Sequence, residues 1–421
     1  MYNYHKRQEI LDEVHARPFQ NLGSPLSLVH IAVLFDGMRG LDIERQVFEL
    51  IRTMGFEFDI EHQGFLFCDQ LPMAIRYEPH NEFYTLTIYQ FDFLERISLP
   101  VSWLEHLPGA LLAGVEILVR KKTGHLLFKG AGNGFRNWSE NHFDNRQLTS
   151  SHVMNEAAVV ATDFQVKTDS SFVQVLVEDT HLLPAQAGLL VQRVCEIETY
   201  RHMALISLPM ARSLMPKLTV LDQKLAAVSQ RTMDEDVADV LAQMMALAAE
   251  VEALSAGTAN RFAASEAYFA LVEKSIQELR ESRVEGVQMV EEFMDRHLNP
   301  ARRTCRSAAA RIELLSKRIA RATELIQSQV NLAIEKQNKE LLEALNTRGQ
   351  RKMKLQAKLE SLSVVVVVYY MYDLVDTALK NLLHAGALLE QLLIVLTISL
   401  PLIIVLTYWM IRRLMKGLRE E

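Results

Sequence analysis

An uncharged stretch near the C-terminal end constrains this chain more than any other feature. Residues 391–411 read QLLIVLTISLPLIIVLTYWMI, which is 21 residues without a charged side chain. About 20 apolar residues let a helix cross the hydrocarbon core of a bilayer. Tyr408 and Trp409 stand at the end of the stretch, where amphipathic rings favour the headgroup region. We therefore predict a transmembrane helix here, and the alternative is a core helix buried in protein.

A second apolar stretch precedes the first and is ambiguous. Residues 361–372 are uncharged, but they are too few to span a bilayer alone. A span over about 362–382 would be long enough, but it would include Asp373, Asp376 and Lys380. The alternatives are a first transmembrane helix, a re-entrant segment and an amphipathic helix lying in the interface.

The distribution of basic residues favours a hairpin of two membrane helices. Positive residues gather on both outer flanks: Arg348, Arg351, Lys352, Lys354 and Lys358 before the first span, and Arg412, Arg413, Lys416 and Arg419 after the second. Between the spans there is only Lys380, with Glu390 beside the second span. Since cytoplasmic flanks carry an excess of Lys and Arg, this pattern predicts a hairpin with both ends in the cytoplasm. A single anchor is the alternative.

The middle of the chain is predicted to be a long helical stalk. Pro300 is the only proline in residues 217–400, and 11 of the 30 residues in 241–270 are alanine, the best helix former. Asn299 and Pro300 suit a helix N-cap and a first helical position, so the sequence predicts a break there. A coiled-coil-like stripe follows at Ile312, Leu315, Ile319, Ala322 and Ile326, and continues at Val330, Ile334, Leu341, Leu345, Leu355, Leu359 and Leu362. This stripe requires a partner, either residues 208–298 folded back on it or another subunit.

The N-terminal part is predicted to be an α+β domain. Runs of β-branched and aromatic residues between turn signals predict strands at 26–35, 65–69, 74–78, 84–91, 115–120, 157–164 and 172–178. Helical periodicity marks residues 41–54, and Pro184 opens a helix that runs to about residue 206. Neither a G-x-G-x-x-G nor a G-x-x-x-x-G-K-[ST] phosphate loop occurs.

Charge and cysteine content argue against several classes of protein. The net charge of −7 argues against a dedicated nucleic-acid binder. The three cysteines are far apart, which argues against a disulfide framework and a structural zinc site. The predicted organisation is an α+β cytosolic domain at 1–205, a helical stalk at 206–360, membrane segments within 361–411, and a basic cytoplasmic tail at 412–421.

The first candidate functional cluster lies close to the N-terminus. Asp12, Glu13, His15 and Arg17 place two acids, an imidazole and a guanidinium within one short segment. His15 could act as a base or metal ligand, Glu13 could orient it, and Arg17 could bind an anion. The alternative is a salt-bridge and capping cluster that docks this segment on the domain. No known metal-ligand spacing or cofactor motif occurs, so the metal is left unknown and no cofactor is identified.

The second candidate cluster lies on the helix predicted after Pro184. Arg193, Glu196 and Tyr200 are spaced at i, i+3 and i+7, and Glu198 and Arg201 form another i, i+3 pair. We expect an ionic network that ties the domain to the stalk. Two further residues could join it: Arg17, and Asp163 at the end of a predicted strand.

Two acidic residues follow the second apolar stretch. Asp373 and Asp376 are three residues apart and share one face of a helix. Carboxylates inside a membrane often mark ion routes, so these two are candidates for an ion path. The alternative is that they lie in water beyond the edge of the hydrocarbon.

Five motifs carry a resemblance to a known family: DEVHARP at 12–18, Trp103 with Leu-Pro-Gly at 107–109, ATDF at 161–164, EIETYR at 196–201, and Leu-Ser-Val at 362–364 with Tyr369 and Tyr370. Together they resemble a bacterial family of predicted membrane-anchored proteins that is described only as a domain of unknown function. The resemblance covers nearly the whole chain, and it implies a membrane location and no established activity. The order of parts is also similar to that of CorA-type magnesium channels, although their Gly-Met-Asn signature is absent between the spans.

These observations predict a membrane-anchored oligomer that acts as a scaffold or sensor. It would hold a cytosolic domain at the bacterial inner membrane, with most of the chain in the cytoplasm. The expected partners are the lipid bilayer and further copies of the chain, without nucleic acid, while a small ligand or ion stays open. One alternative is a CorA-like cation channel or transporter with Asp373 and Asp376 near the ion path. The other is an enzyme that uses Glu13, His15 and Arg17, although no motif assigns a reaction.

Overall fold

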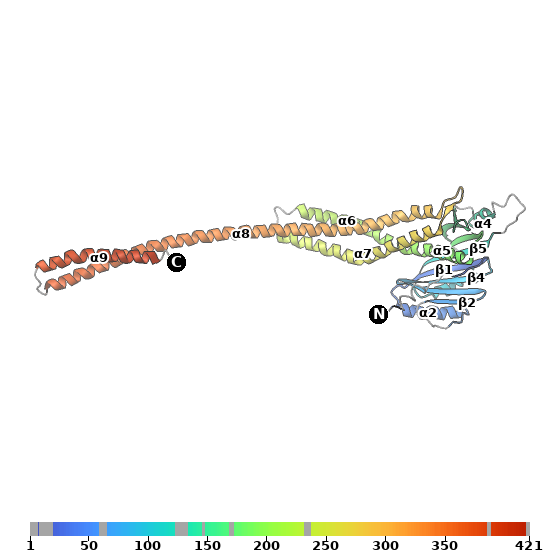
Figure 1. Cartoon of the computed structure of the whole chain (residues 1–421), viewed down its shortest axis with the longest axis horizontal. Helices are drawn as coiled ribbons and strands as arrows, with labels where there is room; N and C mark the ends of the chain where they lie inside the picture. Colours follow the sequence, from blue (N-terminus) through green and yellow to red (C-terminus); the bar gives the residue numbers. More distant parts are fainter. Residues whose placement is uncertain are drawn as a thin grey trace. The chain divides into compact units, whose positions relative to one another are not determined.

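The computed structural model describes residue 7 and residues 20–58, 65–122, 134–144, 148–167, 172–230, 237–384 and 389–417. The chain divides into two compact units, Met1–Thr323 and Glu324–Glu421. The first unit combines a large sheet with helices, and the second is helical (Figure 1). Asp12, Glu13, His15 and Arg17 lie outside the described residues.

The first unit is built on a nine-stranded sheet with the order β2-β3-β4-β1-β5-β8-β7-β6-β9. Its strands are β1 (Leu26–Leu34), β2 (Leu66–Gln70), β3 (Met73–Pro79), β4 (Phe83–Phe91), β5 (Ala110–Lys121), β6 (Thr149–Val153), β7 (Ala158–Val166), β8 (Val173–Asp179) and β9 (Ser282–Arg283). Strands β5 and β8 run parallel, and the other neighbouring pairs are antiparallel. The prediction of an α+β domain with a large sheet is confirmed.

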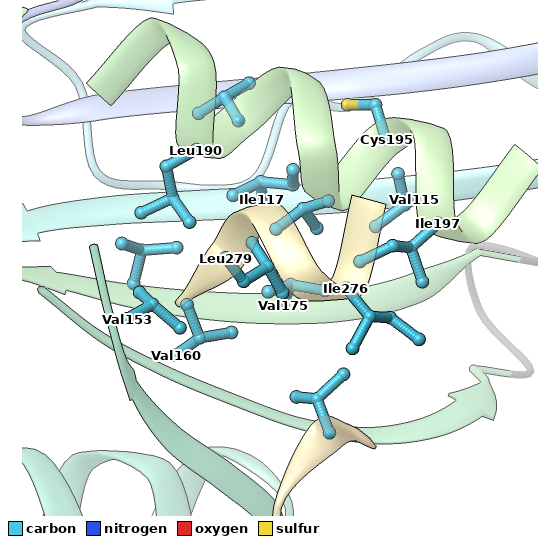
Figure 2. Packing of buried hydrophobic residues seen from close by; sticks show 14 of the residues in the cluster. Val115, Ile117, Val153, Val160, Val175, Leu190, Cys195, Ile197, Ile276 and Leu279 are labelled. Atoms are coloured by element: carbon cyan, nitrogen blue, oxygen red, sulfur yellow. The ribbon is translucent and has the colours of Figure 1, made fainter. Parts of the chain in front are cut away.

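Both faces of the sheet are covered by other elements. The side chains of each strand alternate between the two faces, so each strand contributes to two cores. Leu26 and Leu28 of β1 belong to a core that includes residues of α5 (Pro184–Leu205) and α7 (Val237–Leu279). Figure 2 shows this packing, with Leu190 and Ile197 of α5 close to the strands. Val29 of β1 points the other way, into a core shared with α2 (Gly40–Thr53). Two short helices, α3 (Val101–Glu105) and α4 (Gly134–His142), complete the domain.

Helices α6 (Ser207–Gln230), α7 and the first part of α8 (Val290–His384) pack together. The first part of the predicted stripe is buried here, at Ile312, Leu315 and Ile319. Two ion pairs tie α8 to its neighbours, Arg311–Asp222 at 2.9 Å with α6 and Arg302–Glu266 at 2.5 Å with α7. The partner of this part of the stripe is therefore the earlier helical region of the same chain, which was one of the two predicted alternatives.

The predicted helix break at Asn299–Pro300 is wrong. Helix α8 begins at Val290 and continues through Pro300. Its first N–H groups are capped from outside the helix. The Glu281 carboxylate accepts hydrogen bonds from the backbone N–H groups of Val290 and Glu291 at 3.1 and 3.2 Å, and Ser151 Oγ donates to the same carboxylate at 2.6 Å. Because these side chains satisfy the free donors of the first turn, the helix starts ten residues before the sequence signal.

The second unit comprises the rest of α8 and α9 (Leu389–Gly417). The later part of the predicted stripe is exposed, including Ile334, Leu341, Leu355 and Leu362. Large apolar side chains of α9 are also exposed, at Leu393, Ile398, Leu402, Val405 and Trp409. Figure 1 shows that the chain reverses direction between α8 and α9.

By length and composition, one helix among the described residues could cross a membrane, and it is not the predicted one. It is Ala238–Leu279 of α7. This helix owes its apolar character to alanine, and its Phe269, Val272 and Ile276 lie in the sheet core. Within the predicted span, Thr397–Trp409 is a shorter apolar segment. A membrane hairpin at 362–382 and 391–411 therefore stays a prediction.

Candidate functional site

A polar cavity lies between the sheet and α5 in the first unit. It has a volume of about 100 Å³, which has room for several water molecules. Its floor comes from neighbouring residues on β1, β4 and β3, since His30 pairs with Thr87 and Thr87 pairs with Arg76 in the strand register. Its roof is one stripe of α5, which includes the buried residues Val191, Cys195 and Thr199. Polar side chains thus occupy sheet positions that are apolar elsewhere on this face.

His30 is held at the floor by two hydroxyl groups. Its Nδ1 lies 2.7 Å from Thr87 Oγ1, and its Nε2 lies 3.0 Å from Thr199 Oγ1 of α5. Burial, followed by the nearby charges of Arg76 and His80, lowers the pKa of His30 to about 3. The imidazole is therefore neutral at pH 7, so one ring nitrogen donates and the other accepts.

Arg76 is a buried cation with one open donor. Its side chain is 4% exposed, and its Nη2 donates to Glu78 Oε1 at 2.7 Å. It also has a side-chain hydrogen bond with Tyr89, and its guanidinium lies over the ring of Phe65, with 5.4 Å from Cζ to the ring centroid. The Arg76 Nε atom is buried without a partner among the described residues. Such a donor costs free energy unless a water or ligand accepts its hydrogen.

Helix α5 closes the cavity and connects it to α7. Glu196 accepts hydrogen bonds from Gln192 at 3.0 Å and from Ser275 of α7 at 2.9 Å, and it forms an ion pair with Arg193. Arg193 pairs in turn with Glu278 of α7. Glu196 therefore both lines the cavity and contacts α7.

The second predicted cluster is divided between two environments. Glu196 and Tyr200 line the cavity, and Tyr200 stacks on Tyr268 of α7 with 5.8 Å between ring centroids. Glu198 and Arg201 form a buried bidentate pair at 2.7 and 2.8 Å. Arg201 also lies over the ring of Phe164 at 5.2 Å, on β7. The first pair therefore contacts α7 and the cavity, and the second contacts β7.

Three other candidate residues lie away from the cavity. Asp163 is inside β7, not at its end, and its carboxylate lies 3.4 Å from Lys167 Nζ. Asp373 and Asp376 both belong to α8, and Asp376 pairs with Lys380 at 2.7 Å. Among the described residues, no group of three or more His, Cys, Asp or Glu side chains could hold a metal ion.

The sequence reasoning missed His30, Arg76 and Thr85, because the strands that carry them are far apart in the chain. A signal was nevertheless present. His30 lies between apolar residues inside LSLVHIAVLF, and Arg76 follows the apolar residues Met73, Ala74 and Ile75 inside MAIRYE. Such buried polar residues need partners, and sheet pairing provides them.

The cavity contains groups suited to binding more than to catalysis. His30 is neutral at pH 7, and burial also raises the pKa of the Cys195 thiol, so a thiolate nucleophile is disfavoured. The open groups are the Arg76 Nε donor and the hydroxyl of Thr85, which has no hydrogen-bond partner among the described residues. This arrangement can hold a small polar molecule by hydrogen bonds.

Comparisons with known proteins place the chain in a family but supply no activity. No curated protein and no solved structure matches it. A family model described as "Protein of unknown function (DUF3422)" matches residues 2–418. Since this match covers nearly all of the 421 residues, the chain belongs to the DUF3422 family.

Proposed function

We propose that this protein is a membrane-anchored sensor or scaffold, in which α8 and α9 attach the N-terminal α+β domain to the bacterial inner membrane. The observation that carries the proposal is the exposure of α9. Many of its large apolar side chains are exposed, and Leu393, Ile398, Leu402 and Val405 are each about 60% exposed. A helical segment without charge, as at 391–411, is stable in lipid but not in water when it has such a surface.

The arrangement of charges supports a hairpin with both ends in the cytoplasm. Basic residues flank 362–382 and 391–411 on their outer sides. Asp376 is paired with Lys380 within one helical turn, which reduces the net charge of that face. This pairing favours an anchor over an ion path at Asp373 and Asp376.

Membrane extraction tests the anchor. We expect the full-length protein to stay in the membrane pellet after alkaline carbonate washing. The double substitution Ile398→Arg/Leu402→Arg should weaken insertion by about 2.5–3.5 kcal/mol for each charge at the centre of the span, and should release protein from the pellet. Leu332→Arg changes an equally exposed apolar residue of α8 outside both spans, and should have no effect.

Labelling of a C-terminal cysteine tag distinguishes the hairpin from a single span. In spheroplasts, a hairpin protects the tag from an impermeant maleimide, whereas a single span exposes it. Full-length protein in the soluble fraction would overturn the anchor itself.

We also propose that copies of the chain associate through the exposed stripe of α8. Ile334, Leu341, Leu345, Leu355, Leu359 and Leu362 are all more than half exposed. They fit alternating steps of three and four residues, the spacing of a coiled-coil seam, with Asn338, Arg348 and Lys352 at the intervening seam positions. A shared membrane anchor would orient the helices in parallel, so the same residues of two copies would meet.

The mass of the detergent-purified protein, corrected for bound detergent, tests this association. We expect an oligomer for the wild type and a monomer for Leu341→Lys/Leu355→Lys, because a buried charge at a seam position opposes pairing. Leu325→Lys/Leu332→Lys alters exposed leucines off the seam and is the matched control. A monomeric wild-type protein would exclude a parallel coiled coil.

A further inference from the structure

We infer that the cavity beneath α5 binds a small, uncharged, polyhydroxylated molecule no larger than a monosaccharide. This inference deepens the proposed sensor function by naming the class of ligand. It rests on the juxtaposition of a buried, incompletely paired arginine, a carboxylate and an unpartnered hydroxyl group around one cavity.

Several polar groups around the cavity already have hydrogen-bond partners within the protein. Both ring nitrogens of His30 face threonine hydroxyl groups, and the Glu196 carboxylate accepts from Gln192, Arg193 and Ser275. These groups define the shape of the cavity, and their hydrogen bonds are used within the protein. They are not available to a ligand without rearrangement.

Other polar groups in the lining have unused hydrogen-bonding capacity. The Arg76 Nε atom is buried without a partner among the described residues, and the Arg76 side chain is 96% buried. Glu78 uses one carboxylate oxygen for Arg76 and is 17% exposed. Thr85 pairs with Glu78 in the strand register, so its hydroxyl adds a third position on the same face. A ligand must therefore accept a hydrogen bond from Arg76 and donate one to Glu78.

The charged side chains around the cavity already balance one another. Arg76 is balanced by Glu78, Glu196 is balanced by Arg193, and His30 is neutral at pH 7. An anionic ligand would add an unbalanced negative charge beside two carboxylates. A cationic ligand would add an unbalanced positive charge beside a buried guanidinium. Both are costly in a desolvated site. A neutral molecule with hydroxyl groups can both accept and donate without adding charge.

The lining residues become more exposed from the floor of the cavity to its mouth. The buried members of the lining, Arg76, Thr85 and His30, form the floor. Half-buried members, including Gln20, His80 and Tyr200, lie around the mouth. Tyr200 and Phe83 give aromatic surface, on which the C–H face of a sugar or cyclitol can pack.

The test uses full-length protein in a detergent that has no sugar headgroup. Glycerol, ribose and myo-inositol are the neutral probes, and inorganic phosphate is the charged comparison. Binding is followed by saturation-transfer NMR and by calorimetry. We expect saturable binding of at least one neutral probe at millimolar concentration or below, and none of phosphate.

Thr85 provides the matched variants, because Arg76 substitutions leave Glu78 unpaired and can prevent folding. Thr85→Val keeps the β-branched shape but removes the hydroxyl, and should weaken probe binding by roughly 2- to 10-fold. Thr85→Ser keeps the hydroxyl and should bind like the wild type. Neither should lower the melting temperature of the unliganded protein, since no protein partner is lost.

Three results would overturn the inference: no saturable binding of any neutral probe, preferential binding of phosphate, or equal binding by Thr85→Val and the wild type. Each result can be distinguished from failure of the membrane anchor. Carbonate extraction measures membrane attachment whether or not the protein binds a probe.

Discussion

Arg201→Met is expected to lower the free energy of unfolding by about 3–5 kcal/mol, the usual cost of removing one partner from a buried ion pair. Glu198 is 4% exposed and receives both of its close hydrogen bonds from the Arg201 guanidinium, at 2.7 and 2.8 Å. Without Arg201, the Glu198 carboxylate would stay in the core, and its remaining charged partner in the described part of the chain would be His202, 3.4 Å away. Denaturant unfolding of the purified protein, followed by tryptophan fluorescence, measures the loss.

Two further variants separate the buried charge from the lost contact. Glu198→Leu/Arg201→Met removes both charges and should recover most of the loss, because replacing a buried pair with apolar residues is often neutral. Arg136→Met breaks the exposed Arg136–Glu140 pair and should cost less than about 1 kcal/mol. If Arg201→Met is no more destabilising than Arg136→Met, the Glu198–Arg201 pair contributes little to stability.

Local patterning predicted most of the sheet, because alternation and β-branched residues act over a few positions. The expected strand 26–35 corresponds to β1 (Leu26–Leu34), and 84–91 corresponds to β4 (Phe83–Phe91). Strand β6 (Thr149–Val153) was missed, since its sequence TSSHV is polar. Its serines are buried and bonded to other elements, such as Ser150 Oγ donating to the carbonyl of Val160 at 2.8 Å. A polar strand of this kind is stable only within the assembled sheet.

The start of α8 was predicted wrongly for a related reason. Asn299 and Pro300 have the residue types of a helix start, but the cap comes from Glu281 and from Ser151 of β6. Tertiary contacts that satisfy the first turn carry no signal within a short window of sequence. The capping preferences of single residues therefore predicted the helix start at Asn299–Pro300, whereas tertiary contacts allow the helix to begin at Val290.

The residues of the cavity could likewise be predicted only in part from local spacing. Residues on one helix can be paired by spacing, so Glu196 with Tyr200 and Glu198 with Arg201 could be singled out within α5. The cavity also needs β1, β3 and β4, and nothing in the spacing of His30 and Arg76 indicates that they are two strands apart. Sheet order is a long-range property, and it decides which polar residues meet.

His30 makes the stability of the fold sensitive to mild acid. Burial, then the charges of Arg76 and His80, lowers its pKa from the ordinary 6.5 to about 3 in the folded protein. In the unfolded chain the imidazole takes up a proton as the pH falls below about 6.5, while the folded protein does not. The contribution of neutral His30 to stability is therefore fully present above pH 6.5, and it is lost progressively as the pH falls toward 3. At pH 5 this loss amounts to about 2 kcal/mol, since each pH unit below the unfolded pKa contributes about 1.4 kcal/mol.

His30→Gln should remove this dependence. Unfolding free energies measured at pH 7.5 and pH 5 should differ by about 2 kcal/mol less in His30→Gln than in the wild type. Burial also lowers the pKa of His142, so His142→Gln is the necessary comparison. The carboxylate Glu266 does not interfere: burial raises its pKa, but hydrogen bonds from Arg306 and Arg302 outweigh this and lower it to about 2, so its effect begins only below about pH 4.5. An identical pH dependence in His30→Gln and the wild type would mean that His30 can be protonated within the fold, and that the polar floor of the cavity accommodates a charge.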